Sequence, residues 1–425
     1  MGKIYTVSYG TAKIAIELPS SADVQVLEMG EHPPVPDAMS AAMEALANPV
    51  GSIRLRDKVK PGSRVCVIIP DRTRALPVKV LLKATLDELH AGGVKKGDVT
   101  IVFALGTHRE MSEIEMLSIV GDQVFREYRC MNHDWMDERN LVHLGRTPNG
   151  TPISVNRVVY DADVRVAIGG VNPHRVAGWS GGAKAIQPGV CGADTTGATH
   201  WLSACIPAEE IYGMVHNPVR SEMESVASRV GLEFIINCVV NKRYEPVAIY
   251  AGDFIQAHRM CVEVGKRVYA VDLPEEKDVV ICGTGPYATD MWNVGCGPSE
   301  LVVKPGGAVV VLAPCPDGVS SQHPEVIKYG YRRSLDEVRR LVEEGKICDL
   351  SAAAHLIHAG SVLTRKGATC ILVSEGVSEA EARALGLGYA RTAQEAIDRT
   401  FARYGSKVTV GLYPGDSPTN LFFRR

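Results

Sequence analysis

The chain has 425 residues, a length that favours two domains over a single hydrophobic core. Hydrophobic residues make up 45% and charged residues 22%, and the net charge of −3 argues against a nucleic-acid partner. No apolar run reaches the roughly 18 residues that a membrane-spanning helix requires, so we expect no membrane partner.

The eleven cysteines stand singly in the sequence and form no CxxC pair. Several of them lie inside apolar runs, where a thiol packs as a small hydrophobic group. The N-terminal segment alternates apolar and polar residues and does not resemble a signal peptide. We therefore expect a cytoplasmic protein in a reducing compartment, and no zinc site built from cysteines.

The first half of the chain begins with three short alternating runs within residues 1–30, which predict a small antiparallel sheet. A helix is expected over 37–46, with Asp37 as its N-cap. Apolar runs that end in polar loops and are followed by helical patterns then alternate along the chain, which favours a parallel sheet with helices on both faces. The expected strands are 64–70, 98–106, 164–170, 233–241 and 246–253, and the expected helices are 77–91, 112–119 and 254–269.

The second half repeats this alternation. Its strands are expected at 278–285, 308–316, 368–376 and 407–415, and its helices near 299–303, 335–344, 350–358 and 393–403. The sequence thus predicts an α/β fold of two domains, each with a mostly parallel sheet flanked by helices. We place an N-terminal catalytic and cofactor-binding domain at 1–270 and a C-terminal Rossmann-like domain at 271–425.

Three polar loops follow predicted strands of the first half, at 71–74, 106–109 and 172–175. In open α/β sheets, ligands bind outside the carboxyl ends of the strands, so the three loops can converge on one pocket. In the first loop, Asp71 and Arg74 could bind a phosphate and its partner groups. Alternatively, the two side chains form a surface ion pair of little energetic value.

The second and third loops each contain a histidine followed by an arginine. His108 and His174 suit general acid–base catalysis, because imidazole as a group titrates near neutral pH. Each following arginine could hold a carboxylate or phosphate with two hydrogen bonds. Alternatively, each histidine only hydrogen-bonds a loop carbonyl.

Residues 168–200 are rich in glycine, which indicates a wall where backbone approaches a ligand closely, and not the interior of a helix. Lys184 stands in the middle of this stretch and could be a Schiff-base lysine, a phosphate-binding lysine or the attachment point of another cofactor. It could also be an ordinary solvated lysine. His200 is a candidate metal ligand or an ordinary polar residue.

These residues together resemble the nickel-dependent lactate racemase family. The resemblance rests on DRTR at 71–74, GTHR at 106–109 and NPHRVAGWSGGAKAIQPGVCG at 172–192, with His200 after it. It extends over essentially the whole chain, and the long third segment is its most specific part.

The resemblance implies an active site in a cleft between two α/β domains. It implies a nickel-pincer nucleotide, a pyridinium-3-thioamide-5-thiocarboxylate mononucleotide with nickel, attached covalently to Lys184 and loaded after synthesis by separate enzymes. His200 would ligate the nickel, and His108 and His174 would be the catalytic acid–base pair. Asp71, Thr73 and Arg74 would hold cofactor or substrate.

One segment of the C-terminal half departs from the family pattern. Lactate racemase carries a Tyr-Gln pair and a Lys there, and these positions fall on Val294, Gly295 and Pro298 in this chain. The loss of an ammonium and two polar groups changes what a pocket can hold. We therefore expect a 2-hydroxy acid other than lactate as the small-molecule substrate, with Trp292, Asn293 and Ser299 as candidate contacts beside Arg74.

The sequence thus favours a racemase or epimerase of a 2-hydroxy acid. Two other interpretations are a pyridoxal-phosphate enzyme that uses Lys184 as its Schiff base, and a cofactor-binding protein without racemase activity. Metal content, absorbance and substrate hydrogen exchange would discriminate between the three.

Overall fold

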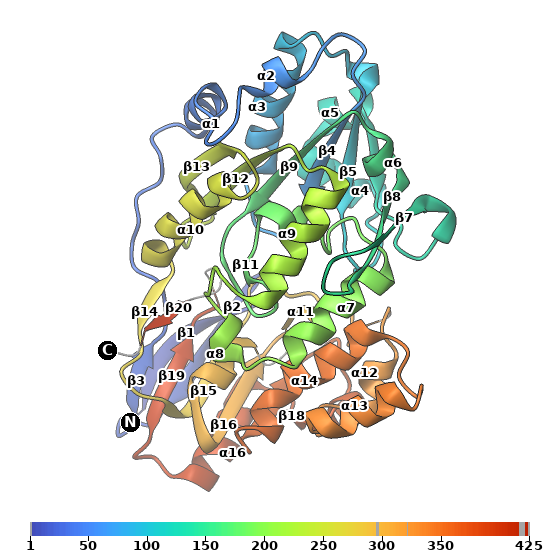
Figure 1. The fold of residues 1–425 in the computed structure, drawn as a ribbon. Helices are drawn as coiled ribbons and strands as arrows, with labels where there is room; N and C mark the ends of the chain where they lie inside the picture. Colours follow the sequence, from blue (N-terminus) through green and yellow to red (C-terminus); the bar gives the residue numbers. More distant parts are fainter. Residues whose placement is uncertain (1, 295–296, 321, 416–420, 424–425) are drawn as a thin grey trace. The chain divides into compact units, whose positions relative to one another are not determined.

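The computed structural model describes residues 2–294, 297–320, 322–415 and 421–423. The chain divides into two compact units (Figure 1). The first unit contains residues 31–199 and 210–269, and the second contains residues 1–30, 200–209 and 270–425. In the described part of the chain, every helix is too short or too polar to cross a membrane.

The first unit is built on a six-stranded sheet in the order β13-β12-β9-β4-β5-β6. Its strands are β4 (Val65–Pro70), β5 (Val99–Ala104), β6 (Arg129–Asn132), β9 (Val164–Gly170), β12 (Phe234–Val240) and β13 (Pro246–Gly252). Neighbours pair in parallel except β13, which runs antiparallel to β12. Continuous apolar runs such as VCVIIP form these strands because both faces of the sheet are covered, as the sequence predicted.

The main helices of the first unit follow its strands, as expected for βαβ connections. They are α1 (Ala38–Ala47), α2 (Leu55–Lys58), α3 (Val78–Ala91), α4 (Glu113–Val120), α5 (Asp122–Glu127), α6 (Arg157–Asp161), α9 (Pro218–Val230) and α10 (Gln256–Val268). Asp37 caps α1 by accepting a hydrogen bond from the backbone of Ser40, which confirms the predicted cap. The expected helices at 77–91, 112–119 and 254–269 are confirmed as α3, α4 and α10.

The second unit is built on a six-stranded parallel sheet in the order β18-β17-β16-β15-β19-β3. Its strands are β3 (Asp23–Val26), β15 (Lys277–Gly283), β16 (Val303–Leu312), β17 (Thr369–Val373), β18 (Gly388–Ala390) and β19 (Thr409–Tyr413). Its helices include α11 (Met291–Val294), α12 (Glu325–Tyr329), α13 (Leu335–Glu343), α14 (Leu350–Thr364), α15 (Glu379–Ala384) and α16 (Ala393–Tyr404). The helix expected near 299–303 is a 3-10 turn at Gly297–Leu301, and α14 extends beyond its predicted end.

The N-terminal residues 1–30 differ from the sequence prediction. The hairpin of β1 (Lys3–Tyr9) and β2 (Ala12–Leu18) is antiparallel as expected. The third run, β3, instead joins the second unit's sheet and runs parallel to β19. Alternation in the sequence specifies a strand but not its partner. The internal contacts therefore group residues 1–30 with 270–425, and the domain boundaries 1–270 and 271–425 remain a prediction.

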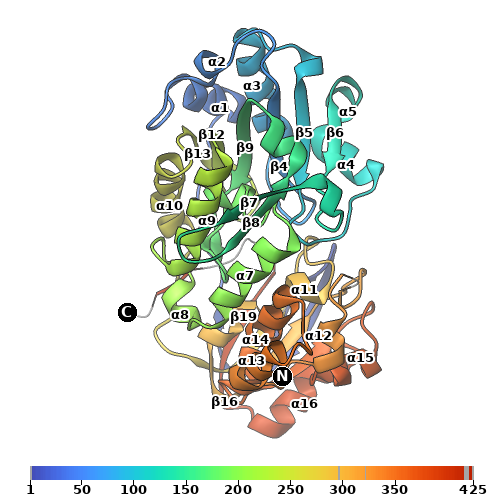
Figure 2. The same ribbon diagram turned by 45° about the vertical axis from the view of Figure 1, so that its right-hand side comes forward.

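Several elements of the first unit lack a clear sequence signal. A hairpin of β7 (Leu141–Arg146) and β8 (Pro152–Asn156) lies beside α9 (Figure 2). Thr147 Oγ1 in its turn donates a 2.6 Å hydrogen bond to the buried Glu222 of α9. Helix α7 (Ala193–Ala204) includes Gly197, so the C-terminal part of the glycine-rich stretch is helical, contrary to the sequence prediction.

Candidate functional site

The polar loops predicted from the sequence leave one edge of the first unit's sheet. Strand β4 is flanked by β5 on one side and β9 on the other, so the chain order reverses at β4. Residues 71–74 follow β4, residues 106–109 follow β5, and residues 171–175 follow β9. The loops therefore lie at the topological switch point, where open α/β sheets bind their ligands.

Asp71 and His108 join the first two loops directly. His108 Nδ1 lies 2.6 Å from Asp71 Oδ2, and the backbone N–H and hydroxyl of Thr73 donate to Asp71 Oδ1 at 3.0 and 2.6 Å. Burial alone would raise the pKa of the Asp71 carboxyl, but His108 and Arg74 hold that pKa well below its usual value. An ionised Asp71 accepts the Nδ1–H of His108 and leaves Nε2 to take or give a proton.

Lys184 lies on the 3-10 turn Gly182–Ala185 and is half-buried. Burial and, to a smaller extent, the nearby guanidinium groups of Arg74 and Arg220 together lower the pKa of its ammonium to about 7, against the opposing effect of Asp71. Among the residues that the structure describes, none accepts a hydrogen bond from Lys184 Nζ. A large fraction of this amine is therefore uncharged and nucleophilic at neutral pH.

Side chains from α9, β12 and α10 hold the turn that carries Lys184. Asn237 Oδ1 accepts the N–H of Gly182 at 2.9 Å, and Arg220 donates to the Gly181 carbonyl at 3.2 Å. A Cβ on Gly182 would lie 3.0 Å from the ring of His258, which hydrogen-bonds the same segment through the Ser180 carbonyl. The glycine backbone at this turn approaches protein side chains closely, and the predicted approach to a ligand stays a prediction.

Sequence reasoning missed these supporting residues. Asn237 offers a signal, because it is a single polar residue inside the apolar run FIINCVV of β12. Arg220 and His258 offer none, because each lies on a helix of mixed polarity and their burial depends on the tertiary fold.

His174 lies in the short hairpin of β10 (Pro173–His174) and β11 (Gly178–Trp179). Its Nδ1 accepts the backbone N–H groups of Val176 and Ala177 at 3.2 and 3.3 Å. Because Nδ1 is an acceptor here, the proton of the neutral ring lies on Nε2. His108 has the opposite arrangement, with its proton on Nδ1 and Nε2 available as a base.

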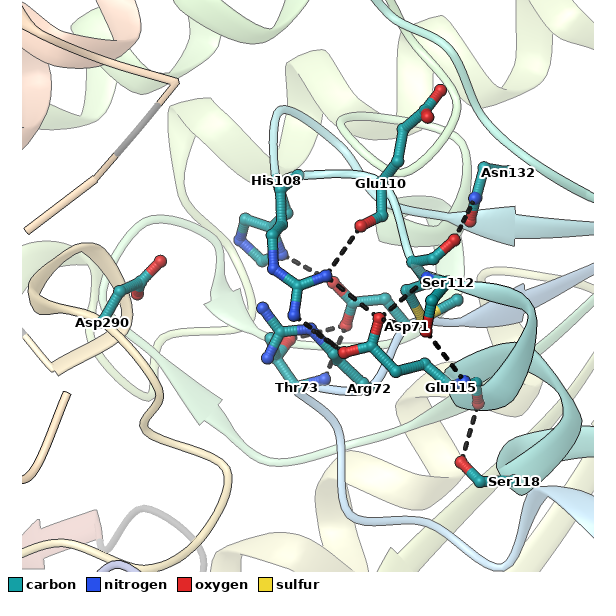
Figure 3. Close-up of polar contacts among 12 residues, drawn as sticks. Asp71, Arg72, Thr73, His108, Glu110, Ser112, Glu115, Ser118, Asn132 and Asp290 are labelled. Atoms are coloured by element: carbon teal, nitrogen blue, oxygen red, sulfur yellow. Dashed lines mark hydrogen bonds and ion pairs between the residues drawn. The ribbon is translucent and has the colours of Figure 1, made fainter. Parts of the chain in front are cut away.

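The arginine after His108 already binds a carboxylate of the protein. Arg109 donates to both carboxylate oxygens of Glu115 at 2.7 and 3.0 Å, and Arg72 Nε lies 3.3 Å from the same group (Figure 3). The hydrogen bonds from Arg109, together with the backbone N–H of Ser112, lower the pKa of Glu115 to about 2 against the effect of burial. Arg109 therefore binds the carboxylate of Glu115 in this structure, where the sequence suggested that it could bind a carboxylate or phosphate of a ligand.

His200 lies on α7, and the internal contacts assign it to the second unit. In that unit, burial, together with the nearby His323 and His200, lowers the pKa of His355 to about 3. The hydroxyl of Ser203 donates to the His200 carbonyl at 2.6 Å and lies 2.8 Å from His358 Nε2. His200 thus belongs to a group of histidines that the sequence reasoning did not connect.

Trp292 lies in the same unit and stacks on two histidines. Its ring centroid is 3.8 Å from that of His323 and 4.5 Å from that of His355, with interplanar angles of 12° and 21°. Asp349 fixes His323 through a 2.5 Å contact with Nδ1. Trp292 is therefore held in one orientation.

The other two candidate substrate contacts are engaged with the protein. The side-chain amide of Asn293 donates to Asp290 Oδ1 at 2.8 Å. Ser299 is fully buried, with its hydroxyl 3.2 Å from Cys282 Sγ, so it cannot reach a bound molecule in this conformation. Gly295, where the family pattern is lost, lies outside the described residues.

A mostly parallel α/β sheet with a histidine–carboxylate pair and a lysine of lowered pKa at its switch point is an arrangement suited to an enzyme. A family described as the lactate racemase N-terminal domain matches residues 9–211. The lactate racemase of Thermoanaerobacterium thermosaccharolyticum is 30% identical over 321 residues, which cover 73% of this chain and 74% of the relative. The lactate racemase of Lactiplantibacillus plantarum is 25% identical over 382 residues, or 87% and 88% of the two chains.

Solved structures agree at the level of the fold. The lactate racemase apoprotein from T. thermosaccharolyticum superimposes with a TM-score of 0.82 at 24% identity, over 99% of this chain and 100% of that one. A Thermotoga maritima protein gives a TM-score of 0.74 at 22% identity, over 93% and 100%. The chain belongs to the lactate racemase family, and it is an isomerase.

Proposed function

We propose that the protein racemises or epimerises a 2-hydroxy acid other than lactate, with a nickel-pincer nucleotide attached to Lys184. The half-buried amine of Lys184, with a pKa of about 7, carries the proposal. Beside it, the pairing of His108 with Asp71 provides a group for moving a hydroxyl proton. Family membership connects these groups to racemisation, since both relatives are named lactate racemases.

The residues of the first unit fit the implied cofactor. Only the neutral form of an amine can bond to a carbon of the cofactor, and part of the Lys184 amine is neutral at pH 7. Arg74 is exposed and close enough to Lys184 to lower its pKa, so it can pair with an anionic group of the nucleotide. Asp71 and Thr73 are buried beside it and would orient these groups.

The half-buried imidazole of His200 is a suitable nickel ligand. His200 would hold the nickel of the nucleotide through an imidazole nitrogen. When bound, the cofactor would accept hydride from the substrate carbon and return it, because no side chain of the protein can do so.

His108 would remove the hydroxyl proton at Nε2. Its Nδ1–H is committed to Asp71, and the ionised carboxylate stabilises the imidazolium that forms. A positioned acid–base group of this kind contributes on the order of 10²–10⁴ in rate.

His174 would deliver a proton to the oxygen from Nε2 on the other side of the substrate. To act as a base for the opposite enantiomer, it must carry its proton on Nδ1, which requires the N–H groups of Val176 and Ala177 to move away. The two histidines are therefore expected to differ in how readily each begins a turnover.

Departure from the family pattern at Val294 and its neighbours supports a substrate other than lactate. Trp292, held against His323 and His355, would present a rigid aromatic edge in place of the missing polar groups. Among the described residues the cysteines are free, which agrees with the proposed cytoplasmic location, where enzymes that make the cofactor would load the protein.

Intact-mass measurement tests the attachment. Protein made together with the cofactor-making enzymes should carry an adduct, and Lys184→Met should abolish it. Lys242→Met, which changes the next lysine in the chain, should retain it. If wild-type protein carries no adduct, or an adduct survives in Lys184→Met, the cofactor assignment is wrong.

Chiral 2-hydroxy acids tested with the loaded protein address the activity. Loss of optical purity with one acid, and slow or no reaction with lactate, would support the proposal. Rapid lactate turnover would contradict the assignment of a different substrate. Adduct formation without turnover of any acid would favour a cofactor-binding protein, and aldimine absorbance without nickel would favour a pyridoxal-phosphate enzyme.

A further inference from the structure

We propose that Glu115 is a positioning residue that sets the geometry of the proposed proton-transfer group, His108, by tying two loops together through Arg72 and Arg109. The inference rests on the proposed function for its kinetic consequence. Its structural consequence can be tested in protein without cofactor.

Two sets of side-chain contacts connect the loop after β4 to the loop after β5. The first is the 2.6 Å contact of Asp71 with His108, which involves the reacting group itself. The second lies one residue further along each loop, where Arg72 and Arg109 both meet the carboxylate of Glu115. Figure 3 shows Asp71, Arg72, His108 and Glu115 in this network.

The contacts of Arg72 and Arg109 with Glu115 restrict the backbone at His108. Arg109 binds Glu115 through both terminal nitrogens and also donates to the Glu110 carbonyl at 2.8 Å. A guanidinium held by three hydrogen bonds restricts its own backbone, and His108 is the adjacent residue. The carboxylate stays ionised, since the pKa of Glu115 is about 2. The ion pairs of Glu115 with Arg72 and Arg109 therefore persist at neutral pH.

Glu115 also caps helix α4, and this structural role can be separated by mutation from its contacts with the two arginines. It completes the capping box of α4, in which Ser112 and Glu115 exchange side-chain and backbone hydrogen bonds. Glutamine serves this role as well as glutamate, so Glu115→Gln keeps the cap and removes the charge that binds both arginines. The second unit offers a matched control: Ser378 and Glu381 form the same capping box on α15. Glu381→Gln removes a carboxylate from that box.

Histidine-ring NMR of the apoprotein gives the first readout. In the wild type, the Nδ1–H of His108 should give a downfield signal because of its short bond to Asp71, assigned by its loss in His108→Gln. Glu115→Gln should broaden or abolish this signal, and Glu381→Gln should leave it unchanged. An unchanged signal in Glu115→Gln would overturn the proposal.

Kinetics of the cofactor-loaded enzyme give the second readout. Displacement of a reacting group by a fraction of an ångström lowers the rate of the chemical step, so we expect Glu115→Gln to reduce kcat about 10-fold. KM should change by less than about 2-fold, because substrate binding is not the target. Glu115→Asp, which restores the charge, should recover part of kcat. Equal effects of Glu115→Gln and Glu381→Gln on kcat would show a role in helix capping alone and overturn the proposal.

Arg109→Lys provides an independent variant if Glu115→Gln does not fold. It keeps the positive charge but cannot donate to both oxygens of Glu115 and to the Glu110 carbonyl in one planar arrangement. A loss of kcat and a broadened His108 signal are expected, and their absence would contradict the proposed role of Glu115 in positioning His108. If the loaded wild type racemises no substrate, the proposed function fails, while the NMR readout still decides the role of Glu115.

Discussion

Lys184 owes its chemical character to residues that lie far from it in the sequence. The glycine-rich context and the charge of Lys184 identified it as a candidate, because both are local features. Its pKa of about 7 arises from burial and from Arg74 and Arg220, which approach it only in the fold. Likewise, the sequence indicated His108 and His174 as a pair, but the opposite placement of their protons follows from Asp71 and from two backbone N–H groups.

The lowered pKa of Lys184 predicts a pH-dependent stability of the apoprotein. Between pH 7 and about 10.5, the unfolded chain binds a proton at Lys184 that the folded protein does not bind. The free energy of unfolding should therefore rise with pH over this window. Lys184→Met should flatten the rise, as measured from urea midpoints at pH 7 and pH 9. Lys242→Met, which removes the lysine that pairs with Glu31, should leave the rise in place.

Helices and strands were predictable where the pattern is local. Helix α1 has its own cap, and the continuous apolar runs of β4 and β9 identify buried parallel strands. Helix α7 was not predictable, because its glycine and polar residues are poor helix formers and the fold overrides that preference. The partner of β3 could not be predicted either, since it lies at the other end of the chain.

The turn before Lys184 requires glycine at 181 because of its positive φ and because of its close neighbours. Comparison with Gly62, a glycine elsewhere in the first unit with positive φ and no close neighbours, separates the two effects. Gly181 has φ +74°, and a Cβ there would lie 2.7 Å from Val171 and 2.8 Å from Asn237. Gly62 has φ +84° with nothing within 4 Å. Gly62→Ala should cost about 1 kcal/mol from backbone strain alone. Gly181→Ala should cost about 3 kcal/mol, because overpacking adds to the strain.

Urea unfolding of both alanine variants measures the difference between the two positions. Equal losses of stability would show that the surroundings of Gly181 yield to a methyl group at little cost. The larger loss at Gly181 would support the view that Asn237 and the glycines hold the lysine-bearing turn as one packed element.

Each of the two compact units has a six-stranded sheet that follows the α/β pattern expected from the sequence, and the sheet of the second unit includes β3 from the N-terminal segment. Val7, Ile16 and Leu18 of the hairpin pack in one core cluster with Ile281 and Val310 of the second unit. This grouping could not be predicted because apolar alternation in β1 and β2 fits many partners. It shows that the stability of the second unit depends on residues from both ends of the sequence.

Deletion of residues 1–26 should therefore destabilise the second unit selectively. Three fully buried side chains alone contribute at least about 5 kcal/mol by their burial. Hydrogen exchange resolved by segment should show loss of protection in β15 and β19, while β4 and β9 of the first unit stay protected. Equal loss in both units would contradict the assignment of residues 1–30 to the second unit.

The pairing of β3 with β19 also has a consequence during synthesis on the ribosome. Asp23 is made early, but its partner Thr409 is made near the end of the chain. At roughly 5–20 residues per second, the wait is on the order of 20 to 80 s. All strands of the first unit's sheet leave the ribosome during that interval, so this sheet can form while the N-terminal strand still has an unpaired edge. Slow translation would lengthen the exposure of that edge, which could then pair with another chain.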